Sequence, residues 1–247
     1  TPTFTPTFTP GPATKLGFII QPPTSATAGA TFNVRVAIQD ASGVTVPYAS
    51  ASITVIIFTY PSGSTYSSIP PVGTLNGVAD FPNLSINTAG GYTLVASATG
   101  LTSATSIAFN VIPAPAVTLI VTGIPITVTA GIPSSVTVTV KDSFGNTVTG
   151  YTGTVAFSSD DPQSMPGNGL PANYTFTTAD AGVKTFTDGV TLKTAGSRSV
   201  TATDTAGNTS TASTRNISVD TIAPAAPVIN EVAGDNVINA GEQTAAI

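Results

Sequence analysis

The side chains that could do chemistry in this chain are carboxylates, because the sequence contains no histidine and no cysteine. It therefore lacks the usual zinc ligands and the commonest general base. Asp160 and Asp161 are adjacent, so on a strand they would point to opposite faces, and before Pro162 they are better explained as turn formers. No Gly-x-Ser-x-Gly motif is present, and no base accompanies the many serines. The sequence predicts that this segment is not an enzyme.

Calcium is the metal ion that these carboxylates would suit best. Four aspartates fall in predicted turns or at a predicted junction: Asp142, Asp188, Asp204 and Asp220. Their hard oxygen atoms are the ligands that Ca2+ prefers, and an ion bound there would stiffen a junction. No D-x-D-x-D-G loop of the EF-hand type is present, so solvated turn carboxylates are the competing interpretation. No cofactor is required, and Ca2+ at junctions is a hypothesis.

Four tyrosines are the candidates for binding a partner. Tyr60 and Tyr66 flank the segment PSGST, and Tyr151 and Tyr174 lie in the second half of the chain. Tyrosine combines an apolar ring with a hydroxyl group and is enriched in binding surfaces. These residues would fit a cell-surface glycan or protein, although loop tyrosines also pack against their own domain.

The elements that must position these residues are repeated. TAG at 27–29 returns at 129–131, and QDASGVTV at 39–46 returns at the same displacement as KDSFGNTV at 141–148. A second TAG pair, at 88–90 and 194–196, is displaced by slightly more. The Pro- and Gly-rich segment DDPQSMPGNGLP predicts a loop that holds the extra length. Two copies of one unit of about 100 residues account for these matches.

Within each copy, apolar and polar residues alternate. Residues 32–38 place Phe, Val, Val and Ile at every second position, and residues 135–140 do the same with Val. This period of two predicts strands with one buried face, and no segment has a sustained helical period. Further strands are predicted at 16–21, 53–59, 78–81, 92–97, 105–112, 117–122, 152–157, 183–187, 197–203 and 210–219. About seven short strands per copy, separated by Gly, Pro and Asn turns, predict an all-β fold of two-sheet sandwiches.

Several of these segments resemble a known family of modules. AGATFNVRVAIQDASG, GVADFPNLSINTAGGYTLVA and their counterparts AGIPSSVTVTVKDSFGNTVTGYTGTVAFSS and GVKTFTDGVTLKTAGSRSVTATD look like bacterial immunoglobulin-like repeats. They are similar to the invasin/intimin-type and filamin-like modules of bacterial surface proteins, over nearly all of residues 15–219. The resemblance implies tandem immunoglobulin-like β-sandwiches of about seven strands each. It is specific for fold and not for function, since such sandwiches serve as stalks, adhesin tips and spacers attached to enzymes.

Two details of the repeat carry further predictions. Asp142 is expected to accept hydrogen bonds from backbone N–H groups two residues on, in a turn where Gly145 and Asn146 tolerate positive φ. The first copy has Val44 in place of Asn146, which argues against a binding role for that asparagine. Tyr92 suits a tyrosine-corner hydrogen bond, whereas the second copy has Arg198 there, which puts a shared corner in doubt.

The predicted organisation has four parts. Residues 1–14, TPTFTPTFTPGPAT, form a Thr/Pro-rich linker of extended, polyproline II-like character. Residues 15–115 and 116–219 are the two sandwiches. Residues 220–247 are a joint followed by the start of a truncated third module, because Ala240–Gly241 repeats the Ala-Gly step that opens each copy. The alternative is that these last residues are a strand waiting for a neighbour's sheet edge.

Composition restricts the function. Charged residues are only 8% of the chain and no basic patch exists, so nucleic acid is not an expected partner. No apolar run approaches the ~20 residues that span a bilayer, so no membrane insertion of this segment is expected. We expect a non-catalytic spacer of an exported bacterial protein, extracellular or at the cell surface, whose neighbouring modules stack and present a distal adhesive or catalytic domain. The alternatives are an adhesin module that binds through loop tyrosines, and a subunit of a filament or surface layer assembled by strand addition.

Overall fold

The computed structural model describes residues 9–205 and 213–220 and is built almost entirely of β-strands. The first half of the chain holds nine of them: β1 (Lys15–Ile20), β2 (Ser25–Thr27), β3 (Thr31–Gln39), β4 (Ser52–Thr59), β5 (Val72–Gly73), β6 (Val78–Ser85), β7 (Gly90–Ser97), β8 (Ala104–Thr105) and β9 (Phe109–Ile112). They form a three-stranded sheet in the order β1-β3-β6 and a larger sheet in the order β2-β9-β7-β4-β5, with β8 also paired to β7. Pairing is antiparallel except between β2 and β9.

The second half repeats this arrangement. Its elements are β10 (Thr118–Thr122), β11 (Thr127–Thr129), β12 (Ser134–Lys141), β13 (Thr154–Ser159), β14 (Met165–Pro166), β15 (Gly169–Leu170), β16 (Tyr174–Thr175), the 3-10 turn η1 (Thr178–Asp180), β17 (Val183–Val190), β18 (Gly196–Asp204) and β19 (Ser213–Asp220). A three-stranded sheet, β10-β12-β17, faces a five-stranded sheet, β11-β19-β18-β13-β16. The parallel pair β11–β19 corresponds to β2–β9 of the first half.

Each half has its own hydrophobic core between its two sheets. In β3 the residues Val34, Val36 and Ile38 are buried, and in β12 the residues Val136, Val138 and Val140 are buried, as the period of two predicts. The first core runs from Leu16 to Ala114 and the second from Leu119 to Val219. The two halves are immunoglobulin-like β-sandwiches, which we call the first and second sandwich, and the predicted fold class is confirmed.

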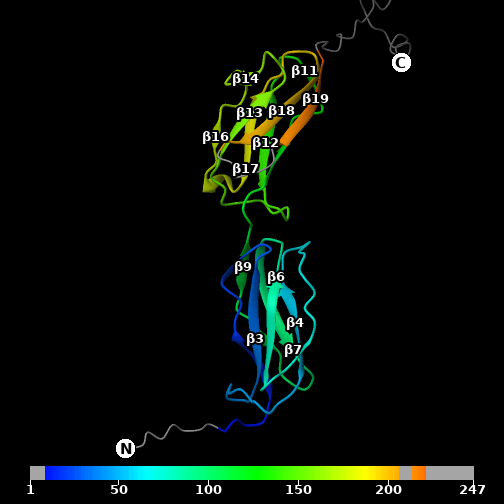
Figure 1. The fold of residues 1–247 in the computed structure, drawn as a ribbon. Helices are drawn as coiled ribbons and strands as arrows, with labels where there is room; N and C mark the ends of the chain where they lie inside the picture. The colour runs from blue at the N-terminus through cyan, green and yellow to red at the C-terminus, as the bar shows by residue number, and fades with distance from the viewer. Residues whose placement is uncertain (1–8, 206–212, 221–247) are drawn as a thin grey trace, which may run out of the picture.

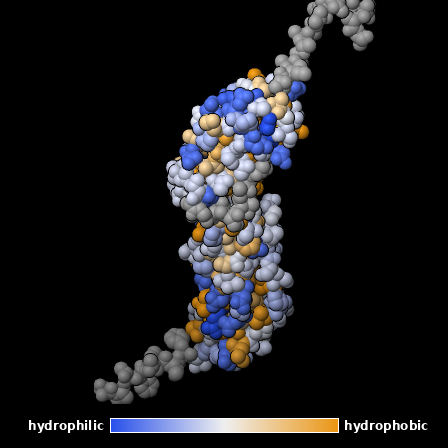
Figure 2. All heavy atoms as spheres, turned by 45° about the horizontal axis from the view of Figure 1, so that its top comes forward, coloured by the Kyte–Doolittle hydropathy of each residue, from blue (hydrophilic) through white to orange (hydrophobic). Residues whose placement is uncertain are grey.

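The two sandwiches lie end to end, with the β12–β13 end of the second facing the first (Figure 1). Most of the molecular surface in Figure 2 has the pale colour of intermediate hydropathy, interrupted by scattered strongly hydrophilic and hydrophobic residues. This surface follows from a composition in which only 8% of the residues are charged.

Most long strands lie where the sequence predicts them, and the short ones were missed. Strands of two or three residues, such as β2, β5 and β16, cannot show a period. Residues 210–212 of the last predicted strand lie outside the described residues, as do residues 1–8 of the linker and residues 221–247 of the predicted third module. The four-part division of the chain therefore stays a prediction.

The tyrosine corner predicted for the first sandwich is present. The Tyr92 hydroxyl donates to the Thr88 carbonyl oxygen at 2.7 Å, with the ring buried in the core. In the second sandwich Arg198 occupies the matching position and makes the corresponding bonds. Its guanidinium donates to the carbonyl oxygens of Thr194 and Ala195, at 3.1 and 2.9 Å. The same loop carbonyl is satisfied in both sandwiches, by a hydroxyl in one and a guanidinium in the other.

Candidate functional site at the joint between the sandwiches

The feature that connects the sandwiches is the turn that follows β12, residues 142–146, which we call the joint turn. Gly145 at its centre has a φ of 84°, a left-handed conformation that favours glycine. Phe144 projects from the turn onto Gly29 of the first sandwich. A Cβ atom added to Gly29 would lie 2.2 Å from the Phe144 ring, so a hydrogen atom at this position lets the ring approach the backbone. The two sandwiches are thus in contact where the Phe144 ring packs against Gly29.

Asn146 joins the two sandwiches through its side-chain amide. The amide nitrogen donates to the Asn87 carbonyl oxygen at 2.7 Å, and the amide oxygen accepts from the Ala89 N–H at 2.9 Å. A primary amide is suited to this site because it offers one donor and one acceptor side by side. These two bonds cross between modules, and a third, to Asp142 at 2.8 Å, fixes the orientation of the amide. Asn146 therefore has a structural role at the joint, which the comparison of the two turns did not predict.

Asp142 fixes the conformation of the joint turn through its carboxylate. Its carboxylate accepts hydrogen bonds from the backbone N–H groups of Phe144 and Asn146, as predicted, and also from Ala114 in the connecting segment, at 2.9 Å. Burial by itself would raise the pKa of Asp142. The Asn146 amide and these backbone N–H groups outweigh that effect and lower the pKa below its ordinary value. The carboxylate is therefore ionised at neutral pH and holds both the turn and the connecting segment.

The first sandwich has the same anchor without the joint residues. Asp40 accepts from the N–H groups of Gly11, Ser42 and Val44 and from the Ser42 hydroxyl. The Ser42 hydroxyl and the Gly11 N–H lower the pKa of Asp40 to about 2. In each sandwich this aspartate ties down the chain that enters it. Ser42 and Val44 stand where the second sandwich has Phe144 and Asn146, so only the second turn carries the residues that reach across a joint.

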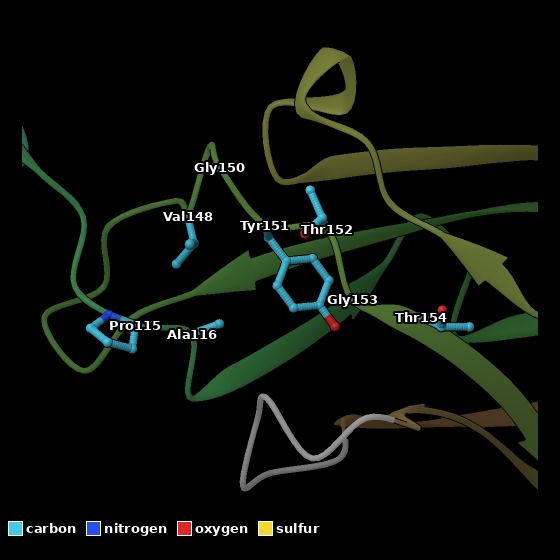
Figure 3. A pocket seen from close by; sticks show the side chains of 8 residues that line it. All are labelled: Pro115, Ala116, Val148, Gly150, Tyr151, Thr152, Gly153 and Thr154. Atoms are coloured by element: carbon cyan, nitrogen blue, oxygen red, sulfur yellow. The ribbon is translucent and has the colours of Figure 1, made fainter.

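A shallow hollow lies beside the joint, between the connecting segment and the start of β13. Figure 3 shows Pro115 and Ala116 on one side of it and the Tyr151 ring on the other. Tyr151 is buried and its hydroxyl donates to the Asp204 carboxylate at 2.5 Å. Burial and the adjacent carboxylate raise the pKa of Tyr151 far above its ordinary value. Since its hydroxyl is already bonded inside the sandwich, Tyr151 stabilises the wall of the hollow and offers little to a ligand.

The four aspartates considered as calcium ligands occupy different places. Asp142 lies in the joint turn and Asp204 against Tyr151. Asp188 lies in β17 with a φ of 52°, and Asp220 ends β19. Across residues 9–205 and 213–220, no three carboxylates come together in the way that a metal site needs. Calcium binding at these aspartates stays a prediction.

The four tyrosines considered for partner binding divide into two pairs. Tyr60 and Tyr66 are 50% and 45% exposed, with ring centroids 6.3 Å apart in an edge-to-face arrangement. Tyr174 packs edge-to-face on Phe176 and Phe186 and lies under the Lys184 ammonium group. Tyr151 is buried, as described above. The structure brings only Tyr60 and Tyr66 together at the surface.

Asp160 and Asp161 each tie the chain to a distant segment, and Asp161 also forms a turn. The Asp160 carboxylate accepts from the Ser199 N–H of β18 at 2.7 Å. Asp161 is buried and accepts from the N–H groups of Gln163, Lys193 and Thr194 and from the Thr194 hydroxyl. It thereby fastens the predicted DDPQSMPGNGLP loop to the segment before β18. Burial opposes the charged form, but these donors lower the pKa of Asp161 strongly. Both carboxylates stabilise the fold by accepting hydrogen bonds, and they do not face a common site as a general acid and base would.

Sequence reasoning missed the residues that make the joint, Phe144 and Asn146. The available signal was the difference between the two turns, DASGV and DSFGN. Val44 in the first turn argues against a ligand-binding role for Asn146, but an aromatic and an amide present in only one of two repeats also fit a contact that only one repeat makes. No helix in the described part of the chain has the length and apolar character needed to cross a bilayer.

No protein-family model matches the sequence, and no curated protein matches it. Among solved structures the chain is similar to FdeC, an adhesin of Escherichia coli, with a TM-score of 0.44 and 20% identity over 85% of this chain and 65% of that one. It is also similar to the Yersinia pseudotuberculosis adhesin InvE, with a TM-score of 0.36 and 17% identity over 83% and 58%. The S-layer protein SbsC, domains 4 and 5, gives a TM-score of 0.31 and 16% identity over 83% and 96%. The chain spans less than two thirds of either adhesin structure.

Proposed function

We propose that this chain is a non-catalytic spacer of a bacterial extracellular or cell-surface protein, in which stacked sandwiches hold a more distal domain away from the surface. The observation that carries the proposal is the Asn146 amide bonded to Asn87 and Ala89 across the joint. A flexible tether needs no such contact. Two bonds of this kind contribute about 2 kcal/mol, which favours the closed joint over an open one by a factor of about thirty.

The connecting segment supports the same function. Pro113 and Pro115 restrict its backbone, and Asp142 holds Ala114 between them. A second hollow runs along the joint where Thr147 and Thr149 face Ala89 and Ile112. The two prolines and the bond from Ala114 to Asp142 thus limit bending of the segment between the sandwiches, which sets the reach of the pair.

The test measures the distance between the sandwiches. The chain has no cysteine, so Thr105→Cys and Ser158→Cys introduce one spin label on each sandwich. Electron–electron distance measurement on the full chain is expected to give one narrow distribution, and small-angle scattering an elongated particle. Asn146→Val, the residue type of the first sandwich, is expected to broaden the distribution. Val44→Asn is the matched control and is expected to leave it unchanged. A broad distribution in the parent protein would contradict the spacer function.

A second function, adhesion through the first sandwich, is favoured by one observation. Tyr60 and Tyr66 are exposed and adjacent, which the other two candidate tyrosines are not. A cell-surface glycan or protein would be the ligand. Binding of the full chain to a glycan array or to cells, lost in the double variant Tyr60→Ala/Tyr66→Ala and retained in Tyr48→Ala, would support adhesion. If the parent chain binds neither glycans nor cells, the adhesion function is contradicted and the spacer function remains.

A further inference from the structure

The outer face of the larger sheet in the first sandwich is apolar. Ile56 and Phe58 on β4 are 50% and 64% exposed, and Ile107, between β8 and β9, is 43% exposed. Val95 on β7 is paired with Ile56, so the two side chains lie on the same face of the sheet. We call Ile56, Phe58, Val95 and Ile107 the apolar sheet face. Large side chains gathered on one exposed sheet face are unusual in a monomer and indicate an interaction surface.

The sheet that carries this face contains no charged residue. Its strands read SAT, FNVI, GGYTLVAS, SITVIIFT, VG and AT. The charged residues of the first sandwich lie on the other sheet and at its ends, where Arg35 pairs with Asp80 and Asp40 holds its turn. A ligand with charged groups would find no counter-charge on this sheet, whereas an identical sheet would meet it without like-charge repulsion.

The second sandwich shows that the fold does not need apolar residues here. Ser158 pairs with Thr201 in the register in which Ile56 pairs with Val95, one position beyond the pairs Phe157–Ala202 and Val55–Ala96. Phe58 lies two residues after Ile56, at the bulge in β4, and the residue two positions after Ser158 is Asp160. Of the inward-facing residues of β13, Val155 and Phe157 are apolar and buried like Ile53 and Val55, whereas Ser159 stands where the first sandwich has Ile57. The apolar sheet face is therefore a property of the first sandwich alone.

We propose that the apolar sheet face packs against the same face of a second copy of this chain, pairing two spacers side by side through their first sandwiches. A two-fold arrangement is self-complementary, because each copy supplies the same apolar and uncharged surface to the other. Charge cannot oppose this contact within the sheet, and removal of Ile56, Phe58 and Ile107 from water drives it. The proposal is independent of the joint, since a chain that stays monomeric could still be a spacer.

The first experiment follows self-association of the full chain by sedimentation equilibrium over a wide concentration range. The parent chain is expected to form a dimer. Ile56→Lys and Phe58→Lys are each expected to weaken dimerisation at least about tenfold, because a charge replaces a buried apolar group. Ser158→Lys, at the matched position of the second sandwich, is expected to have no effect. Thermal unfolding of each variant checks that the fold is intact. A monomeric parent chain, or equal weakening by Ser158→Lys, would overturn the proposal.

The second experiment leaves the apolar side chains unchanged. Thr93→Cys, beside the face on β7, is treated with a bismaleimide linker of about 10 Å, the spacing of two packed sheets. A cross-linked dimer is expected, and little is expected from Ser199→Cys at the matched position of the second sandwich. Equal cross-linking of both variants would count against the proposal. Glycan binding that is lost in Phe58→Lys, with a parent chain that does not self-associate, would assign the face to a sugar and also overturn it.

Discussion

The Asn146 amide of the second sandwich lies 2.7 Å from the Asn87 carbonyl oxygen of the first, donating a hydrogen bond across the joint. The amide oxygen of Asn146 accepts a second bond across the joint from the Ala89 N–H, so one side chain pairs with both a donor and an acceptor of the neighbouring backbone. Asp142 orients that side chain and also binds the segment that connects the sandwiches. The joint is therefore a small polar network attached to an aromatic contact, and each part can be tested separately.

Replacing Asn146 by aspartate should open the joint at neutral pH. The substitution keeps the shape but turns the donor that faces Asn87 into an acceptor, and it places a second carboxylate beside Asp142. The like charge raises the pKa of the introduced group. Interdomain distances in Asn146→Asp should be broad at pH 7 and should narrow as the pH falls and the introduced carboxyl becomes protonated, because it can then donate to Asn87 again. A distribution equal to that of the parent at pH 7 would show that the amide does not hold the joint.

Replacing Gly29 by alanine should displace the Phe144 ring and weaken the joint. The added Cβ atom would lie 2.2 Å from that ring. Gly131→Ala is the matched control, because Gly131 has nearly the same φ, 78° against 77°, and no described atom lies within 4 Å of its added Cβ atom. Both variants lose about 1 kcal/mol from backbone strain, and only Gly29→Ala should broaden the interdomain distance. Equal broadening in both would contradict the role of the aromatic contact.

Acid should weaken the anchors of both sandwiches. The pKa of Asp142 is lowered in the folded protein, and that of Asp40 is lowered to about 2. A lowered carboxyl pKa contributes stability that is complete above the unfolded value of about 3.9 and is lost as pH falls through the folded value. The free energy of unfolding in urea should be flat from pH 8 to about 5 and fall below about pH 4. The fall should be smaller in Asp142→Asn and Asp40→Asn, and an unchanged profile would contradict the assignment.

Tyr92 and Arg198 should contribute similar amounts to the free energy of unfolding, although one donates through a hydroxyl group and the other through a guanidinium group. Tyr92→Phe leaves the Thr88 carbonyl oxygen without its hydroxyl donor. Arg198→Ala removes the two bonds from the guanidinium group to the carbonyl oxygens of Thr194 and Ala195, which lose their donors. Each variant should lose about 1–2 kcal/mol of unfolding free energy, measured by urea denaturation. Tyr48→Phe, whose side chain is 69% exposed, should lose less than about 0.5 kcal/mol. A neutral Tyr92→Phe would show that the corner does not stabilise the first sandwich.

Tyr151 should stabilise the second sandwich through its hydroxyl group. The buried pair Tyr151–Asp204 is 2.5 Å apart, and hydrogen bonds to charged groups contribute about 1.5–3 kcal/mol. Tyr151→Phe should lower the unfolding free energy by an amount in that range, while the interdomain distance stays unchanged. A large change in the joint with little loss of stability would instead give Tyr151 a role at the hollow beside the connecting segment.

The fold class, the two copies and most of the long strands can be predicted from the sequence, because a period of two and a repeated turn are local patterns. The sequence also predicts the Tyr92 corner and the role of Asp142 as a turn former, since both depend on residues close in the chain. The bridge that Asn146 makes between the sandwiches and the contact of Phe144 with Gly29 became visible in the three-dimensional structure. Those contacts join residues far apart in sequence, and a side chain's type does not state which backbone it will meet. The same holds for the apolar sheet face, because Ile56, Val95 and Ile107 share one surface only after three separate strand segments have paired.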